Sequence, residues 1–179
     1  MLVLLPPSET KRAGGDGPPL VSAALSFPDL DPMRTELVDE LVELAGDVAG
    51  SRAALGLSSR QDEEIARNAE LWTAPTVPAL HRYAGVLYDA LDAASLRGAA
   101  AARARARLMV GSALFGLLRA SDPVPAYRLS AGSGLPAGRR SRRAGAPCSS
   151  RCWLRSPPVT PWWTCGRGRT RRSPGCPAR

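Results

Sequence analysis

Residues 110–132 constrain the fold more than any other stretch of the chain. They read VGSALFGLLRASDPVPAYRLSAG, so small residues, turn formers and two arginines separate short apolar runs. Gly111 and Gly116 bracket four residues, and glycine at such points usually marks a sharp turn or a close approach of the backbone. The apolar run 107–111 that leads in predicts a central β-strand. The prolines that follow predict an extended segment around Tyr127.

This stretch matches a known family signature at nine positions. They are Gly116, Leu117, Leu118, Arg119, Asp122, Tyr127, Arg128, Leu129 and Gly132. Residues 2–11 (LVLLPPSETK) and 83–91 (YAGVLYDAL) agree with the same family. Phe115, Ala126 and Ser130 depart from it, where the family carries Tyr, Pro and Glu. Over residues 1–135 the chain therefore resembles the YaaA-type peroxide stress proteins.

The resemblance implies an α+β fold, with one domain in which a mixed sheet is surrounded by helices. It also implies a cytoplasmic protein that protects against peroxide by limiting intracellular iron and DNA damage. The partner it implies is DNA, bound through a helix-hairpin-helix motif and a positively charged cleft. The turn Leu55-Gly56-Leu57 is a weak match to such a motif.

The charge of the chain is divided between two regions. Residues 1–136 contain 13 basic and 16 acidic residues, a net charge of −3. Residues 137–179 contain 11 arginines, no acidic residue and all four cysteines. The overall charge of +8, which alone would indicate a nucleic-acid partner, therefore comes from the second region. We predict a domain over residues 1–136 and a disordered Arg/Pro/Cys-rich tail over residues 137–179.

Three interpretations of the tail compete. One is an arginine-rich arm that binds nucleic acid. A zinc or disulfide site is disfavoured, because the spacing of Cys148 and Cys152 fits no standard ligand pair and residues 1–5 are too short for an export signal. We favour a one-base frameshift near residues 136–139. Read in a shifted frame, the codons of residues 161–165 encode an apolar residue, Val, Asp and another apolar residue, so the native C-terminal part of the domain is predicted to be missing.

The N-terminal apolar run 2–5, closed by two prolines, predicts a buried strand that ends abruptly. The polar loop behind it carries Ser8 and Lys11. Both are candidate binding residues, because loops that leave buried strands often carry ligand sites; the alternative is a solvated loop. We predict a flexible loop over residues 13–19 and a proline-marked linker over residues 73–78.

Four helices are predicted between and after these loops. The first begins at Asp31 as N-cap, and its carboxylates form a solvated face. The second is capped by Ser59. The third begins at Pro78, and its apolar face is expected to contain Tyr83, Val86, Leu87, Ala90 and Leu91. The fourth is the alanine- and arginine-rich segment 93–107.

Arg119 and Arg128 are predicted to bind an anion, because the rigid guanidinium fork suits phosphate or carboxylate. The alternative is a structural ion pair with Asp122 or Asp89. The complete set of candidate DNA- or anion-binding residues is Ser8, Lys11, Ser112, Arg119, Tyr127 and Arg128. Tyr83 and Tyr88 are candidates for lining the site, or they simply pack in the core. The only histidine is His81, and a lone histidine does not by itself predict a catalytic base.

The residue patterns contain no nucleophile–base set, no Walker loop, no dinucleotide fingerprint and no cluster of iron ligands. We therefore predict no catalytic residue, no cofactor, no bound metal and no membrane partner. Two alternatives to the DNA-binding protein stay open. One is a small-anion binder or an enzyme, and the other is a non-functional truncated product with exposed apolar strands. Steep salt dependence would distinguish DNA binding from binding in a compact pocket.

Overall fold

The computed structural model of the protein describes residues 1–130 and 132–135 and confirms the predicted α+β class. The predicted tail, 137–179, lies outside the described residues. The strands are β1 (Val3–Leu5), β2 (Gly17–Pro19), β3 (Pro75–Pro78), β4 (Leu108–Ser112), β5 (Gly116–Arg119) and β6 (Pro123–Val124). The α-helices are α1 (Asp31–Ala45), α2 (Val48–Leu55), α3 (Asp62–Ala69), α4 (Ala79–Arg82), α5 (Val86–Leu91) and α6 (Gly98–Arg107). Short 3-10 helices cover Ser22–Ala24, Pro28–Leu30, Ser59–Gln61 and Ala93–Ser95.

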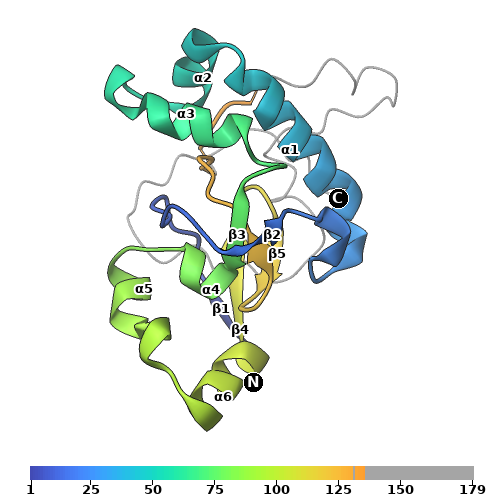
Figure 1. Ribbon diagram of the computed structural model, residues 1–179, viewed down its shortest axis with the longest axis vertical. Coiled ribbons are helices and arrows are strands. Elements are labelled where there is room, and N and C mark those ends of the chain that lie inside the picture. The colour runs from blue at the N-terminus through green and yellow to red at the C-terminus, as the bar shows by residue number, and fades with distance from the viewer. Residues whose placement is uncertain (131, 136–179) are drawn as a thin grey trace, which may run out of the picture.

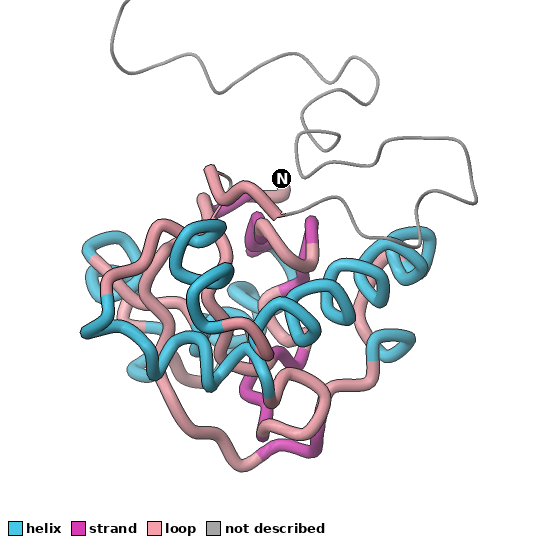
Figure 2. The backbone as a smooth tube through the Cα atoms, turned by 90° about the horizontal axis from the view of Figure 1, so that it is seen from above, coloured by secondary structure: helices cyan, strands magenta, loops and turns pink. Residues whose placement is uncertain are grey.

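The helices form two groups around the strands. The group α1–α3 lies at one end of the molecule, and α5 and α6 lie at the other (Figure 1). Seen from above, the strands run through the middle with helices on both sides (Figure 2). None of the helices within the described ranges has the length and apolar character of a membrane span.

The first sheet has the order β1-β4-β5, so β4 is its central strand, as predicted. β1 pairs with β4 in parallel, and β4 pairs with β5 as an antiparallel hairpin. Val110 on β4 is fully buried, which explains the unbroken apolar run of this strand. Gly116 has a φ of +71°, a conformation that glycine adopts without steric cost, and it lies opposite Ser112 where the hairpin closes.

The second sheet corrects two sequence predictions. The expected loop 13–19 contains β2, and the expected linker 73–78 contains β3; these strands pair with each other and β3 pairs with β6, in the order β2-β3-β6. The strands are short and rich in proline, which has no N–H to donate and is usual only at sheet edges. The sequence pattern therefore resembled connecting segments rather than strands.

The helix boundaries differ from prediction in two places. Asp31 is the first residue of α1 rather than its cap, and its carboxylate accepts a hydrogen bond from the Ser22 hydroxyl. Ser59 is not a cap but the first residue of the 3-10 helix that precedes α3; this short helix is capped by Ser58, with Gln61 completing a capping box. Buried α1 side chains are Arg34, Leu37, Val38 and Leu41.

The predicted third helix is broken into α4 and α5. The break contains Tyr83 and Gly85, and the φ of Gly85 is +108°, outside the helical region. Because of this break, the predicted apolar face is not continuous: Val86 is 91% exposed, whereas Tyr88 is buried. Helix periodicity could not reveal this change of direction, because it assumes a continuous axis.

A fully buried arginine, Arg82, joins three separate segments at the end of α4. Its guanidinium donates to the carbonyl of Val124 at 3.0 Å, to that of Pro75 at 3.2 Å and to that of Arg12. Burial lowers the pKa of this guanidinium, because its charge leaves water. These bonds connect β3, β6 and the N-terminal loop, and they satisfy carbonyls that the short strands leave free.

We expect the substitution Arg82→Leu to lower the free energy of unfolding by roughly 3 kcal/mol, because three carbonyls lose their donors. The exposed Arg103 on α6 provides a matched control, and Arg103→Leu should change stability by less than about 0.5 kcal/mol. Urea titration followed by circular dichroism measures both. Equal stabilities of the two variants would contradict a structural role for Arg82.

Strand β1 presents apolar side chains to solvent. Leu2 is 60% exposed and Leu4 is 52% exposed, although β1 is an edge strand of its sheet. Apolar edge strands are sites at which chains associate. The prediction of a buried strand over residues 2–5 is therefore wrong, because only Leu5 of this run is buried.

We expect Leu4→Lys to reduce self-association of the protein, because a charge on an edge strand disfavours pairing with another chain. Val21 is similarly exposed (57%) but belongs to no strand, so Val21→Lys is the control. Light scattering over a concentration series gives the measurement. If both lysines have the same effect, the edge of β1 is not responsible.

Candidate functional site

Most of the predicted binding residues gather where β1 and β4 end. Because the two strands are parallel, with Leu5 beside Val110, the segments that follow them emerge at the same edge of the sheet. The first segment carries Ser8 and Lys11, and Ser112 ends the second strand. An isolated β-bridge joins Lys11 to Tyr83. We define the Lys11 site as Ser8, Lys11, Tyr83, Tyr88, Ser112, Tyr127 and Arg128.

A chain of hydroxyl groups lies inside the site. The Tyr127 hydroxyl is 2.8 Å from the Ser112 hydroxyl and 2.8 Å from the Tyr83 hydroxyl. The amides of Leu114 and Phe115 donate to Ser112 Oγ at 3.2 and 2.9 Å and thereby occupy its two lone pairs. The Ser112 hydroxyl must then donate to Tyr127, which donates to Tyr83.

The Lys11 ammonium group lies over this chain. Nζ is 4.1 Å from the ring centroid of Tyr127 and 5.5 Å from that of Tyr83, within the range of cation–π contacts. It donates to the carbonyls of Ser8 at 3.0 Å and Glu9 at 3.3 Å. Burial is the main cause that lowers the pKa of Lys11 to about 8; the charge of Glu9 opposes this shift, and the charge of Arg128 contributes to it.

The tyrosines are held in their neutral form. Burial raises the pKa of Tyr127 to about 12, and it raises the pKa of Tyr83 and of Tyr88. The Tyr88 ring stacks on Tyr83 at 5.6 Å between centroids, and its hydroxyl donates to the Pro6 carbonyl at 2.6 Å. Both residues therefore pack in the core, and their role in lining a binding site stays a prediction.

Two residues that the sequence analysis missed position Arg128. Asn68 on α3 brackets its backbone, because the side-chain amide donates to the Arg128 carbonyl at 2.9 Å and accepts from its N–H at 2.8 Å. Glu9 binds the guanidinium at 3.1 Å. Asn68 could have been noticed as a polar residue three positions after Ile65, on the buried side of α3.

Arg119 does not join the Lys11 site. It lies opposite Met109, at the other end of the β4–β5 hairpin from Ser112. Its guanidinium is 5.8 Å from the Phe27 ring, and its backbone N–H donates to Asp122 at 2.9 Å. Ser8 does belong to the site, since its hydroxyl donates to the carbonyl of Ala84, next to Tyr83.

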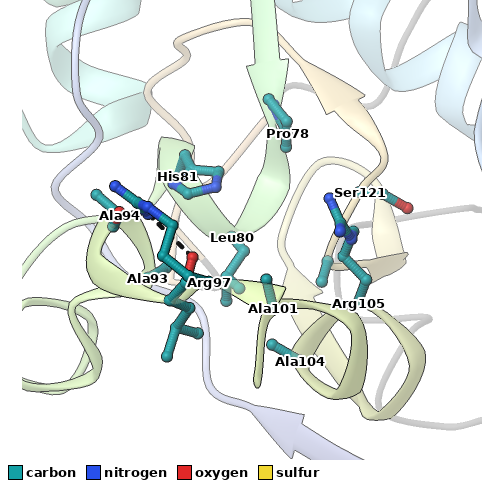
Figure 3. Close-up of a pocket in the computed structure, with 12 residues that line it drawn as sticks. Pro78, Leu80, His81, Ala93, Ala94, Arg97, Ala101, Ala104, Arg105 and Ser121 are labelled. Carbon is teal, nitrogen blue, oxygen red and sulfur yellow. Dashed lines mark hydrogen bonds between the residues drawn. The ribbon is translucent and has the colours of Figure 1, made fainter. Parts of the chain in front are cut away.

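A separate cavity of about 250 Å³ lies between α4, α6 and the segment after β5. Its polar lining residues are His81, Arg97, Arg105 and Ser121, and Figure 3 shows Arg97 on one side and Arg105 on the other. Arg97 donates to the carbonyl of Leu96 at 2.9 Å and to that of Ala94. No residue of the Lys11 site lines this cavity.

The turn between α2 and α3 contains a glycine in the left-handed conformation, Gly56, at a φ of +66°. Its amides are already used, because Gly56 and Leu57 donate to the Arg52 carbonyl and Ser58 donates to the Gln61 side chain at 3.1 Å. A phosphate would have to displace these bonds, and the helix that follows begins with acidic residues.

In the ranges 1–130 and 132–135 no group of three or more His, Cys, Asp or Glu could hold a metal ion.

We expect the stability of the protein to depend on pH through Lys11. Its folded-state pKa of about 8 lies below the ordinary value of 10.5, so between these values the unfolded chain binds more protons and the free energy of unfolding rises with pH. Relative to Lys11→Met, the wild-type protein should gain about 1.5 kcal/mol from pH 8 to pH 9.5. Urea titrations at both pH values test this. Parallel pH profiles would show that Lys11 titrates as an exposed lysine.

A sequence model described as peroxide stress protein YaaA matches residues 1–144. The chain is 53% identical over 137 residues to a UPF0246 protein of Streptomyces coelicolor, covering 76% of this chain and 53% of that protein. It is 50% identical over 136 residues to a UPF0246 protein of Corynebacterium glutamicum, with the same two shares. The chain thus spans about half the length of the curated relatives it matches. These matches confirm the resemblance seen in the sequence, and the chain belongs to the YaaA peroxide stress protein family.

Proposed function

We propose that this protein acts in protection against peroxide and that the Lys11 site binds phosphate groups of DNA. The family supports the first part. The second part is carried by one observation: Lys11 and Arg128 are brought together beside a chain of hydroxyl donors. The limitation of intracellular iron belongs to the same proposed role and rests on the family alone.

The geometry of the site suits a phosphate. Asn68 holds the backbone of Arg128 on both sides, and Glu9 contacts its guanidinium at 3.1 Å. Its partner Glu9 is 57% exposed, so a phosphate can replace this carboxylate at little cost in burial. Lys11 adds a second positive charge, and charge-assisted bonds to phosphate are stronger than neutral ones.

The same geometry sets the character of the DNA binding. Residues 1–136 have a net charge of −3, so few phosphates can be neutralised outside the site. Because the amides of the α2–α3 turn are occupied, we assign the phosphate contact to the Lys11 site rather than to a helix-hairpin-helix. The site should therefore contribute one or two ion pairs with DNA phosphates to the salt dependence of the DNA affinity.

A second candidate function is the binding of a small anion, favoured by the cavity lined by His81, Arg97 and Arg105. No acidic residue lines this cavity. Inorganic phosphate or pyrophosphate would occupy it without affecting the Lys11 site. Loss of binding on Arg105→Ala but not on Lys11→Ala would identify this function.

We expect Lys11→Ala and Arg128→Ala each to weaken binding to a fluorescent 20-base-pair duplex about tenfold at 50 mM NaCl, and to lower the slope of log affinity against log salt by about 1. Lys11→Arg should retain most of the binding, since it keeps the charge. Fluorescence anisotropy over a salt series provides the measurement.

The control for this experiment is Arg103→Ala, which removes an exposed charge outside the site. The arginines of residues 137–179 are the same in every variant, so only differences between variants report on the site. If all three alanine variants lose the same affinity, binding is a property of overall charge and the proposal is wrong.

A further inference from the structure

The chain uses one lysine and 23 arginines. Lys11 is the only lysine among 179 residues, so every other basic side chain in the Lys+Arg total of 24 is a guanidinium. An arginine in a protein keeps its proton, whereas a lysine that leaves water loses its proton readily. The one side chain that can become a neutral amine is therefore the one at the centre of the candidate site.

Burial disfavours the charged form of Lys11, and it outweighs the two carbonyls and two tyrosine rings that contact the ammonium group. Within residues 1–130 and 132–135 no carboxylate pairs with its ammonium group, and the nearby Glu9 side chain binds Arg128 at 3.1 Å instead. Two of its N–H groups donate to the carbonyls of Ser8 and Glu9, which aim Nζ at the Tyr127 ring. The residue is half-buried, so the amine combines partial removal from water with access from the surface.

We propose that Lys11 is a nucleophile that forms a Schiff base with an aldehyde bearing a phosphate group. This inference rests on the proposed function, since it names the substrate class of the same site. Arg128 would hold the phosphate, and Lys11 would meet the carbonyl carbon. A sugar aldehyde within DNA and a small phosphorylated aldehyde share this chemistry.

The reaction needs no other reactant. The lone pair of the neutral amine attacks the carbonyl carbon, so a C–N bond forms while the C=O π bond breaks. A proton moves from nitrogen to oxygen, and the resulting carbinolamine loses water to give the imine. With a pKa of about 8, roughly half of Lys11 is neutral at pH 8. The buried tyrosines keep their protons at that pH, and the Tyr83 hydroxyl, which ends the donor sequence from Ser112 through Tyr127, is the one left to donate to the departing oxygen.

The single lysine makes the experiment specific. The full chain is incubated at pH 8 with sodium cyanoborohydride, which reduces an imine to a stable amine. Three separate arms contain a duplex with one abasic site, glyceraldehyde 3-phosphate, and unphosphorylated glyceraldehyde. Intact mass and peptide mapping then assign each adduct either to Lys11 or to the α-amino group of Met1, the two amines available.

We expect the adduct on Lys11 to form at least about tenfold faster than on Met1, and faster with the phosphorylated aldehydes than with glyceraldehyde. Lys11→Arg, which keeps the charge, should abolish it. Arg128→Gln should slow the phosphorylated aldehydes to the rate of glyceraldehyde, whereas Arg103→Gln should change nothing. Circular dichroism spectra of all variants verify that they are folded.

The outcomes separate this inference from the proposed function. If duplex DNA binds in a Lys11-dependent manner and no aldehyde forms an adduct there, the inference is overturned and the DNA-binding function stands. If glyceraldehyde 3-phosphate labels Lys11 while the duplex neither binds nor reacts, the inference stands and DNA is the wrong ligand. Equal labelling of Lys11 and Met1 also overturns the inference, because it shows ordinary amine reactivity.

Discussion

The buried guanidinium of Arg82 is the contact on which the arrangement of the site depends. It binds carbonyls of three segments that are far apart in the sequence: the loop of Arg12, strand β3 and strand β6. The Arg34 side chain stabilises the β4–β5 hairpin in the same way. Its guanidinium donates to the carbonyl of Phe115 at 2.9 Å and to that of Leu117 at 2.8 Å. Short strands rich in proline make few ladder bonds, and the five donors of a guanidinium replace them.

The bonds made by Arg82 and Arg34 hold polar groups of the Lys11 site in the protein interior, away from water. Because Arg82 attaches the loop that carries Lys11 to α4, the next residue, Tyr83, lies beneath the lysine, and the break after it allows Tyr88 to stack. Desolvation then acts in opposite directions on the two kinds of group. It lowers the pKa of Lys11 and raises the pKa of the tyrosines. The Lys11 ammonium group therefore loses its proton at a lower pH than the neighbouring tyrosine hydroxyls do.

Sequence reasoning succeeded where the signal was local or came from a family signature. The central strand and the helix after Asp31 follow from apolar runs and turn residues. It failed where partners distant in the sequence decide the outcome. The strand β3 and the break at Tyr83 exist because of pairing and packing, and Arg119 was separated from Arg128 by the direction of a hairpin.

The sequence by itself determined the central strand and the presence of one lysine in a chain of arginines, because these properties depend on composition and on patterns within about ten residues. The class of fold followed from the resemblance of the sequence to a known family. Only the tertiary structure decided that this lysine lies over two tyrosines, that Asn68 orients Arg128 and that Arg82 connects three segments. Such contacts join residues up to 116 positions apart, as Lys11 and Tyr127 are. Their geometry follows from strand pairing and from the burial that packing imposes, and neither can be read along the chain.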